Sequence, residues 1–173
     1  MSLFNKKYLI QSNRLPGWDY THAGYYFITI CVDRMQCVLG KIDDQGITLS
    51  DIGKIVAEEW IKTECIRSYV NLDQWVIMPN HFHAIIRINE RKNVEMTRRV
   101  ISTLSPNSLG SIIGQFKSQC TKRIRSGHLS SFQWQRNYHD HIIRDEKSLE
   151  SIRQYILNNP LKWDLDEYHP SRK

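Results

Sequence analysis

The segment 69–88, "YVNLDQWVIMPNHFHAIIRI", contains two strand-like runs that are separated only by Pro79–Asn80. Proline and asparagine are favoured in tight turns, and strands joined by two residues pair as an antiparallel hairpin. Successive strand residues point to opposite faces, so His81 and His83 project together while Phe82 points the other way, toward the core. The chain is therefore expected to build an antiparallel sheet that carries two imidazoles side by side on one face.

The rest of the chain alternates strand-like and helix-like stretches. "GYYFITICV", rich in aromatic and β-branched residues, predicts a central strand. Serine and aspartate are favoured N-caps and predict where three helices begin. The other expected strands span 37–43 and 132–144, and the helices begin after Ser50, Ser108 and Asp145, the first ending near Cys65 and the third before Pro160.

This order of elements predicts an α+β fold of the ferredoxin-like type, an antiparallel sheet with helices packed on one face. At 173 residues the chain is expected to form a single domain, 1–173, with a polar, basic loop at 89–107. No apolar run approaches the ~18 residues of a membrane span, so no membrane association is expected. The N-terminus lacks a signal-peptide pattern, which predicts a cytoplasmic protein. The four cysteines of the chain are expected to be reduced thiols in the core.

The positive charge is concentrated in the second half of the sequence. Residues 1–86 carry 8 Lys/Arg and 9 Asp/Glu, giving −1, whereas residues 87–173 carry 16 and 9, giving +7. Within that half, residues 87–125 hold nine basic and two acidic side chains, again +7. Such a segment indicates a polyanionic partner, with solubilisation as the alternative.

The two histidines offer two positions of a metal site, because neutral imidazole is a good ligand for divalent cations. Tyr155 and Asn159 lie four residues apart on one face of the third expected helix. A phenol is a candidate nucleophile for a phosphodiester when a cation neutralises the phosphate, and the Asn159 carbonyl oxygen could complete the metal shell. Each residue alone also fits a structural role, as a hydrogen-bonded histidine, a half-buried aromatic or a helix-ending asparagine.

Together these residues resemble a known family. "VIMPNHFHAIIRI" resembles the HUH motif, and "SIRQYILNNPLKW" resembles the tyrosine-bearing helix of the REP-associated tyrosine transposases, single-tyrosine HUH enzymes related to insertion-sequence transposases. "RLPGWDYTHAGYYFITICVDR", "GSIIGQFKSQCTKRI" and "WQRNYHDHIIRDEKSL" are similar to that family in the same order. The resemblance covers about residues 14–164.

The resemblance implies an endonuclease and strand transferase that acts on single-stranded or hairpin-forming DNA through a 5′-phosphotyrosine. His81, His83 and Asn159 would bind Mg²⁺ or Mn²⁺, and Tyr155 would be the nucleophile. A bacterial, nucleoid-associated location follows. Monomer and homodimer both remain open, and His139 and His141 are read as a structural or DNA-facing pair. The expected DNA contacts are Arg14, Trp18, Arg87, Arg98, Arg99, Lys117, Lys122 and Arg123.

Three alternatives remain. A HUH nickase of the relaxase or replication-initiator type would share the chemistry but usually belongs to a longer chain. A catalytically inert hairpin-binding protein would not need the histidine, tyrosine and asparagine set. An RNA-binding ferredoxin-like domain would read bases by stacking on its sheet, but the sequence lacks the aromatic strand motif of that class.

Overall fold

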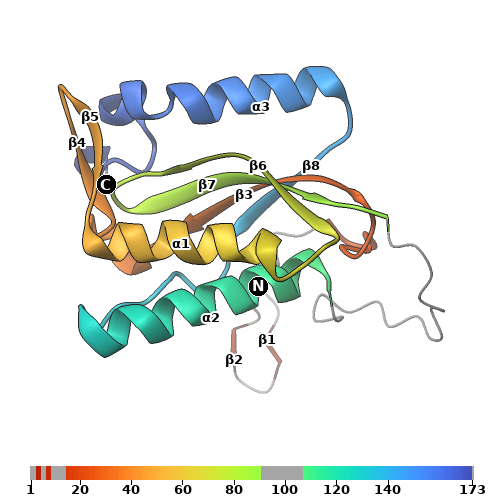
Figure 1. The fold of residues 1–173 in the computed structure, drawn as a ribbon, viewed down its shortest axis with the longest axis horizontal. Coiled ribbons are helices and arrows are strands. Elements are labelled where there is room, and N and C mark those ends of the chain that lie inside the picture. The colour runs from red at the N-terminus through yellow and green to blue at the C-terminus, as the bar shows by residue number, and fades with distance from the viewer. Residues whose placement is uncertain (1–2, 5–6, 9–14, 91–106, 173) are drawn as a thin grey trace.

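The computed structural model describes residues 3–4, 7–8, 15–90 and 107–172. Its centre is a four-stranded antiparallel sheet in the order β6-β7-β3-β8 (Figure 1). These strands span Gly24–Cys31 (β3), Val70–Ile77 (β6), His81–Ile88 (β7) and His139–Ile143 (β8). Two short antiparallel hairpins pair Leu3–Phe4 (β1) with Lys7–Tyr8 (β2), and Gly40–Asp43 (β4) with Gly46–Leu49 (β5).

The three helices begin where the capping residues predict. They span Asp51–Cys65 (α1), Leu109–Gly127 (α2) and Glu146–Asn158 (α3). Ser50, Ser108 and Asp145 each accept a hydrogen bond from the backbone N–H three residues later, which stabilises the first turn. Short 3₁₀ helices span Asp33–Met35, Pro160–Leu165 and Pro170–Arg172.

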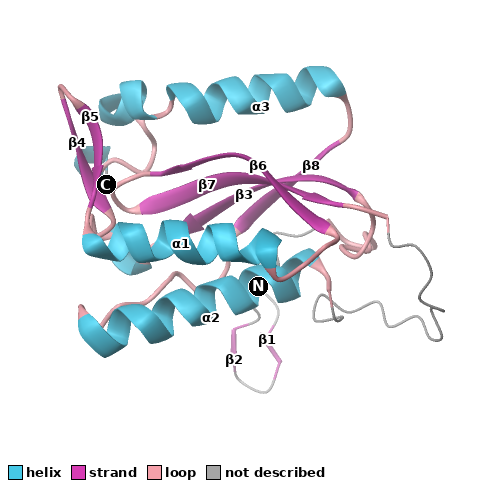
Figure 2. Cartoon of the chain, viewed as in Figure 1, coloured by secondary structure: helices cyan, strands magenta, loops and turns pink. Residues whose placement is uncertain are grey.

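The helices cover both faces of the sheet. In Figure 2, α1 and α2 lie below it and α3 lies above it. The larger core lies on the α1–α2 face, where Trp60, Phe82 and Phe116 contact one another within 5.8 Å between ring centroids. A smaller core on the other face joins the sheet to α3 through Ile85, Ile143, Leu149 and Ile156. The α+β class and the antiparallel sheet are confirmed, but the expectation that all helices pack on one face is wrong, because β7 places apolar side chains on both faces.

Other parts of the chain also differ from expectation. The last strand covers only His139–Ile143, and Trp134 pairs with Val32 in an isolated bridge. Cys37 and Cys65 are exposed, so only two of the four free thiols are core residues. Residues 91–106 of the basic loop lie outside the described residues. None of the described helices is long and apolar enough to span a membrane.

Candidate active site

The paired histidines begin strand β7 and are buried, with exposed fractions of 0% for His81 and 1% for His83. Their Nε2 atoms lie 3.0 Å apart. The neighbouring Phe82 points into the larger core on the opposite face, as strand alternation predicts. Two imidazole nitrogens therefore converge on one point beneath α3.

Asn80 determines which ring nitrogen of His81 carries the proton. The Asn80 Nδ2 group donates hydrogen bonds to the carbonyl oxygens of Met35, at 3.2 Å, and Tyr168, at 2.8 Å. These two bonds orient the amide, so its Oδ1 faces His81 Nδ1 at 2.8 Å and accepts a hydrogen bond from the Nδ1–H group. A neutral imidazole carries one proton, so His81 Nε2 is left with a free lone pair directed at His83.

His83 is held from two sides by β3. Its Nδ1 lies 2.8 Å from the hydroxyl of Thr29, the residue opposite it in the sheet, and its ring stacks on Phe27 with centroids 5.4 Å apart. Burial lowers the pKa of His83 to about 3, and burial together with the neighbouring His83 lowers the pKa of His81 well below its usual value. Both rings are therefore neutral at physiological pH, the state in which imidazole binds metal ions.

Helix α3 brings Tyr155 to the same place. The Tyr155 hydroxyl lies 3.4 Å from His83 Nε2, and its ring meets those of His83 and Phe27 edge-on. The side chain is still 44% exposed, so a substrate can reach it. Burial, followed by the charges of Asp166 and Glu167, raises the pKa of the phenol, which is protonated at neutral pH.

Asp166 completes a cluster that sequence reasoning missed. Its Oδ2 lies 4.0 Å from His81 Nε2, and ligand atoms of His81, His83 and Asp166 all lie within 4.8 Å of one another, each residue being buried. The 3₁₀ turn Pro160–Leu165 after α3 carries the carboxylate back to the histidines. No periodicity marks Asp166 among the neighbouring acidic residues, so only tertiary structure distinguishes it.

Asn159, the predicted third ligand, lies beside this cluster. Its Nδ2 donates to Asp166 Oδ2 at 3.2 Å, while its Oδ1 is buried and has no hydrogen-bond partner in the part of the chain that the structure describes. A buried carbonyl oxygen without a partner is costly unless a ligand or water satisfies it. The arrangement thus offers two imidazole nitrogens, a carboxylate and an unsatisfied amide oxygen, a donor set that suits a divalent cation.

A salt bridge fixes α3 above the sheet. Arg153 donates two hydrogen bonds to the Asp73 carboxylate, at 2.9 and 2.7 Å, and Asp73 lies at the irregularity of β6 between Leu72 and Trp75. The apolar core beneath α3 is small, and this bidentate ion pair adds a second, directional contact between α3 and strand β6. It therefore helps to place Tyr155 over the histidines.

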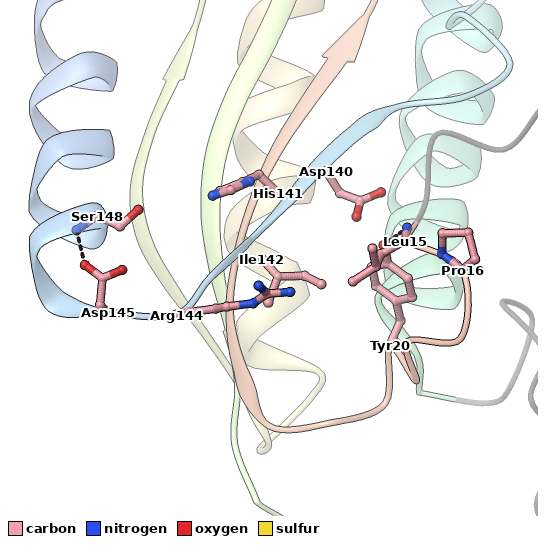
Figure 3. A pocket seen from close by; sticks show the side chains of 9 residues that line it. All are labelled: Leu15, Pro16, Tyr20, Asp140, His141, Ile142, Arg144, Asp145 and Ser148. Atoms are coloured by element: carbon pink, nitrogen blue, oxygen red, sulfur yellow. Dashed lines mark hydrogen bonds between the residues drawn. The ribbon is translucent and has the colours of Figure 1, made fainter.

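Strand β8 carries the second histidine pair to the same face of the sheet. His139 lies opposite Thr29 and His141 opposite Phe27, and both histidines are exposed. A hollow of about 580 Å³ opens beside this edge strand, where His141 points toward α3 and Asp140 toward Tyr20 (Figure 3). The hollow does not include the buried histidine cluster. The candidate active site is therefore identified by side chains that converge on one point, and not by the size of a cavity.

The residues predicted to contact DNA are scattered. Trp18 is half-buried and donates to the Tyr26 hydroxyl, Arg87 lies exposed over the Tyr25 ring, and Arg123 is engaged by two carboxylates. Lys117 and Lys122 lie on one flank of α2. Arg14, Arg98 and Arg99 lie outside the described residues.

Comparison with known proteins identifies the family. Residues 20–159 match the family described as "Transposase IS200 like". An uncharacterised protein of Haemophilus influenzae is 38% identical over 166 residues, covering 92% of each chain. Another protein of that organism, described as a candidate REP-associated tyrosine transposase, is 27% identical over 162 residues and is matched over 83% of its length, with 87% of this chain covered.

A solved structure has the same fold. A REP-associated tyrosine transposase bound to a REP hairpin superposes with a TM-score of 0.57 at 20% identity, covering 94% of this chain and 74% of that one. With a family match spanning most of the sequence and a relative aligned over nearly its whole length, the chain belongs to the IS200-like transposases, enzymes that act on DNA.

Proposed function

We propose that the protein is a metal-dependent endonuclease and strand transferase for hairpin-forming, single-stranded DNA, with Tyr155 as nucleophile. The observation that carries the proposal is the 3.4 Å separation of the Tyr155 hydroxyl from His83 Nε2, within the cluster of His81, His83 and Asp166. The hairpin substrate is proposed because a structural neighbour is a transposase bound to a REP hairpin and a sequence relative is described as REP-associated.

The residues present fit a bound cation. The lone pair on His81 Nε2 faces His83 Nε2 at 3.0 Å, and the Asn159 carbonyl oxygen has no partner among the described residues. His81, His83 and Asp166 would hold Mg²⁺ or Mn²⁺, with Asn159 as a further ligand. Asn80 and Thr29 orient the two imidazoles from behind, as partners of metal-bound histidines usually do. When bound, the ion would neutralise charge on the scissile phosphate.

Tyr155 performs the covalent step. Its phenol oxygen forms a bond to phosphorus while the bond from phosphorus to the 3′ oxygen breaks, so the protein keeps a 5′-phosphotyrosine and the departing strand takes a proton as its 3′-hydroxyl. The phenol proton is lost to solvent through the exposed edge of the ring. A later 3′-hydroxyl reverses these changes and joins a strand, so no nucleotide cofactor is consumed.

The experiment is a covalent-capture assay. A 5′-labelled or 3′-labelled single strand with a hairpin is incubated with protein and Mn²⁺, and the adduct is resolved on a denaturing gel. Only the 3′-labelled strand should remain attached, since the phosphate 3′ of the cut is the one bonded to tyrosine. Tyr155→Phe should abolish the adduct and chelator should prevent it. Tyr69→Phe, whose hydroxyl bonds Asn107 instead, is the matched control and should react normally.

Two outcomes would overturn the proposal. An adduct that persists in Tyr155→Phe would mean another nucleophile. Hairpin binding with no metal-dependent cleavage of any hairpin DNA tested would mean that the protein only binds hairpins. Either result leaves the family assignment intact but removes the mechanism.

A further inference from the structure

The 3₁₀ turn Asp33–Met35 contains two residues in an unfavourable backbone conformation. Arg34 and Met35 have φ angles of 52° and 55°, in the left-handed region. Residues other than glycine rarely adopt this region, because the Cβ atom comes too close to a carbonyl oxygen. Two such residues in succession persist only where the surrounding structure holds them, and strain of this kind is concentrated at functional sites. The contacts of the turn therefore indicate what it does.

The turn lies directly against the residues that precede the paired histidines. Val32 N donates to Asn80 O at 2.9 Å, and Leu39 N donates to Pro79 O at 3.0 Å. Between these two contacts, the Met35 carbonyl oxygen accepts from Asn80 Nδ2 at 3.2 Å. The Asn80 side chain is buried, so its amide depends on protein partners.

The partners of the Asn80 amide decide which of its two ends faces His81. A primary amide has an NH₂ group that donates and an oxygen that accepts. The NH₂ group points to two carbonyl oxygens, which can only accept, and these belong to Met35 and Tyr168. The amide oxygen is thereby left for His81 Nδ1. The Met35 carbonyl is thus one of two groups that keep the hydrogen of His81 on Nδ1 and the lone pair on Nε2.

A neighbouring segment holds the turn in its strained conformation. Asp33 N donates to Gln133 O at 2.9 Å, and Gln135 Nε2 donates to Met35 Sδ at 3.2 Å. Gln135 is itself fixed to α2, since its carbonyl oxygen accepts from Lys117 Nζ at 2.6 Å. The position of the Met35 carbonyl is therefore determined by contacts with distant parts of the chain.

Arg34 offers a way to change the backbone of the turn alone. Its side chain is 86% exposed and forms an ion pair with the neighbouring Asp33 at 3.7 Å. Replacing it removes no buried side chain. A substitution at this position changes chiefly how readily the chain adopts a positive φ.

We propose that the left-handed turn at Arg34 and Met35 is a positioning device for the metal site. It holds the Met35 carbonyl against Asn80, and Asn80 in turn keeps the hydrogen of His81 on Nδ1, so that Nε2 is available to the ion. Arg34 and Met35 are positioning residues, because they act through Asn80. The inference rests on the proposed function, which makes the histidine cluster a metal centre.

The test compares four substitutions at one exposed position. Arg34→Gly and Arg34→Asn remove the guanidinium but accept a positive φ, whereas Arg34→Val and Arg34→Ile remove it and disfavour that conformation. The control Lys41→Val places a β-branched residue at an exposed position of strand β4, where an extended backbone accepts it. Circular dichroism of each full-length variant shows whether it is folded.

The measurements are made on His81 and on metal affinity. In chelator, long-range ¹H–¹⁵N correlation spectra show which ring nitrogen carries the hydrogen, and calorimetry then gives the affinity for Mn²⁺. The wild type, Arg34→Gly, Arg34→Asn and Lys41→Val should all show the Nδ1–H form alone and have Mn²⁺ affinities within about 2-fold of one another. Arg34→Val and Arg34→Ile should show both forms and bind Mn²⁺ at least about 5-fold more weakly, because changes behind a metal-bound histidine typically cost ~10–100-fold.

A double variant tests whether the turn acts through Asn80. Asn80→Ala removes the amide and should weaken Mn²⁺ binding by about 10–100-fold. Arg34→Val/Asn80→Ala should then bind no more weakly than Asn80→Ala, because two changes that act through one group are not additive. Gln135→Ala, which releases Met35 from the other side, should weaken binding by less than Asn80→Ala.

Three results would overturn the inference. They are a single Nδ1–H form with wild-type Mn²⁺ affinity in Arg34→Val, equal losses in Arg34→Gly and Arg34→Val, and additive losses in the double variant. If Arg34→Val and Arg34→Ile do not fold, Gln135→Ala decides, and wild-type behaviour of His81 in that variant would equally overturn it. Failure of the covalent assay together with the expected spectra would remove the tyrosine chemistry but leave the role of the turn standing.

Discussion

Acid should destabilise the metal-free protein through its two buried histidines. Burial lowers the pKa of His83 to about 3 and that of His81 well below 6.5, near which both titrate in an unfolded chain. Below pH 6.5 the unfolded chain therefore binds more protons than the native state, and the free energy of unfolding falls as pH falls. This loss begins as pH passes 6.5 and, for His83, ends near pH 3.

The expected magnitude is large. For His83 the cost is about 1.4 kcal/mol for every pH unit below 6.5, so moving from pH 7 to pH 5 removes ~2 kcal/mol, and His81 adds a further loss in the same direction. A domain of this kind has only about 5–15 kcal/mol of stability. Carboxylates titrate near pH 4 in an unfolded chain, so this window isolates the histidines.

The assay is urea unfolding, followed by tryptophan fluorescence, in chelator at pH 7 and pH 5. His83→Gln should lose ~2 kcal/mol of the wild-type pH dependence, while the control variant His128→Gln changes a histidine at an exposed position. Added Mn²⁺ should raise wild-type stability at pH 7 and have little effect at pH 5, because metal binding requires neutral imidazoles. A wild-type change below about 1 kcal/mol, or the same change in His83→Gln, would refute the reasoning.

Two further variants test the surroundings of the site. Asp166→Asn should weaken Mn²⁺ binding at least about 10-fold by calorimetry, because it removes a buried negative charge beside the imidazoles. The control Asp164→Asn changes a side chain that is 95% exposed and should not affect Mn²⁺ binding. Equal Mn²⁺ affinities of the two variants would exclude Asp166 as a ligand. Arg153→Gln removes the bidentate contact to Asp73 and should lower the local stability of α3 by about 1.5–3 kcal/mol. The backbone amides of α3 should therefore exchange at least about 10-fold faster with deuterium. Exchange as slow as in the control variant Lys147→Gln would show that the small apolar core alone holds the helix.

Local patterns predicted the elements that place the histidines. Three capping residues marked the helix starts, and the turn at Pro79–Asn80 set the register of the β6–β7 hairpin. Strand alternation then determined that Phe82 faces the larger core while His81 and His83 face away from it. The same alternation requires the tyrosine helix to cover the imidazole face, opposite α1 and α2. The prediction that all helices pack on one face was based only on the order of strands and helices along the chain. It did not take into account that strand alternation places the imidazoles on the face opposite Phe82.

Asp166 could not be found in the same way. It follows an irregular 3₁₀ turn rather than a strand or helix, so no period relates its direction to that of Tyr155. Asp164 and Glu167 are equally plausible from sequence, yet Asp164 is exposed while Asp166 is buried against His81. The choice among them depends on where the turn docks, which is decided by contacts distant in sequence.

The docking of that turn is coupled to the chemistry of the histidines through Asn80. The Asn80 NH₂ group donates to Tyr168 O in the segment that carries Asp166, and the Asn80 carbonyl oxygen accepts a hydrogen bond from His81 Nδ1–H. The Asp166 carboxylate in turn accepts from Tyr168 N at 2.7 Å. The same contacts therefore fix the carboxylate in place and leave His81 Nε2 unprotonated. These contacts within one chain bring the Tyr155 hydroxyl, the two imidazoles and the Asp166 carboxylate together.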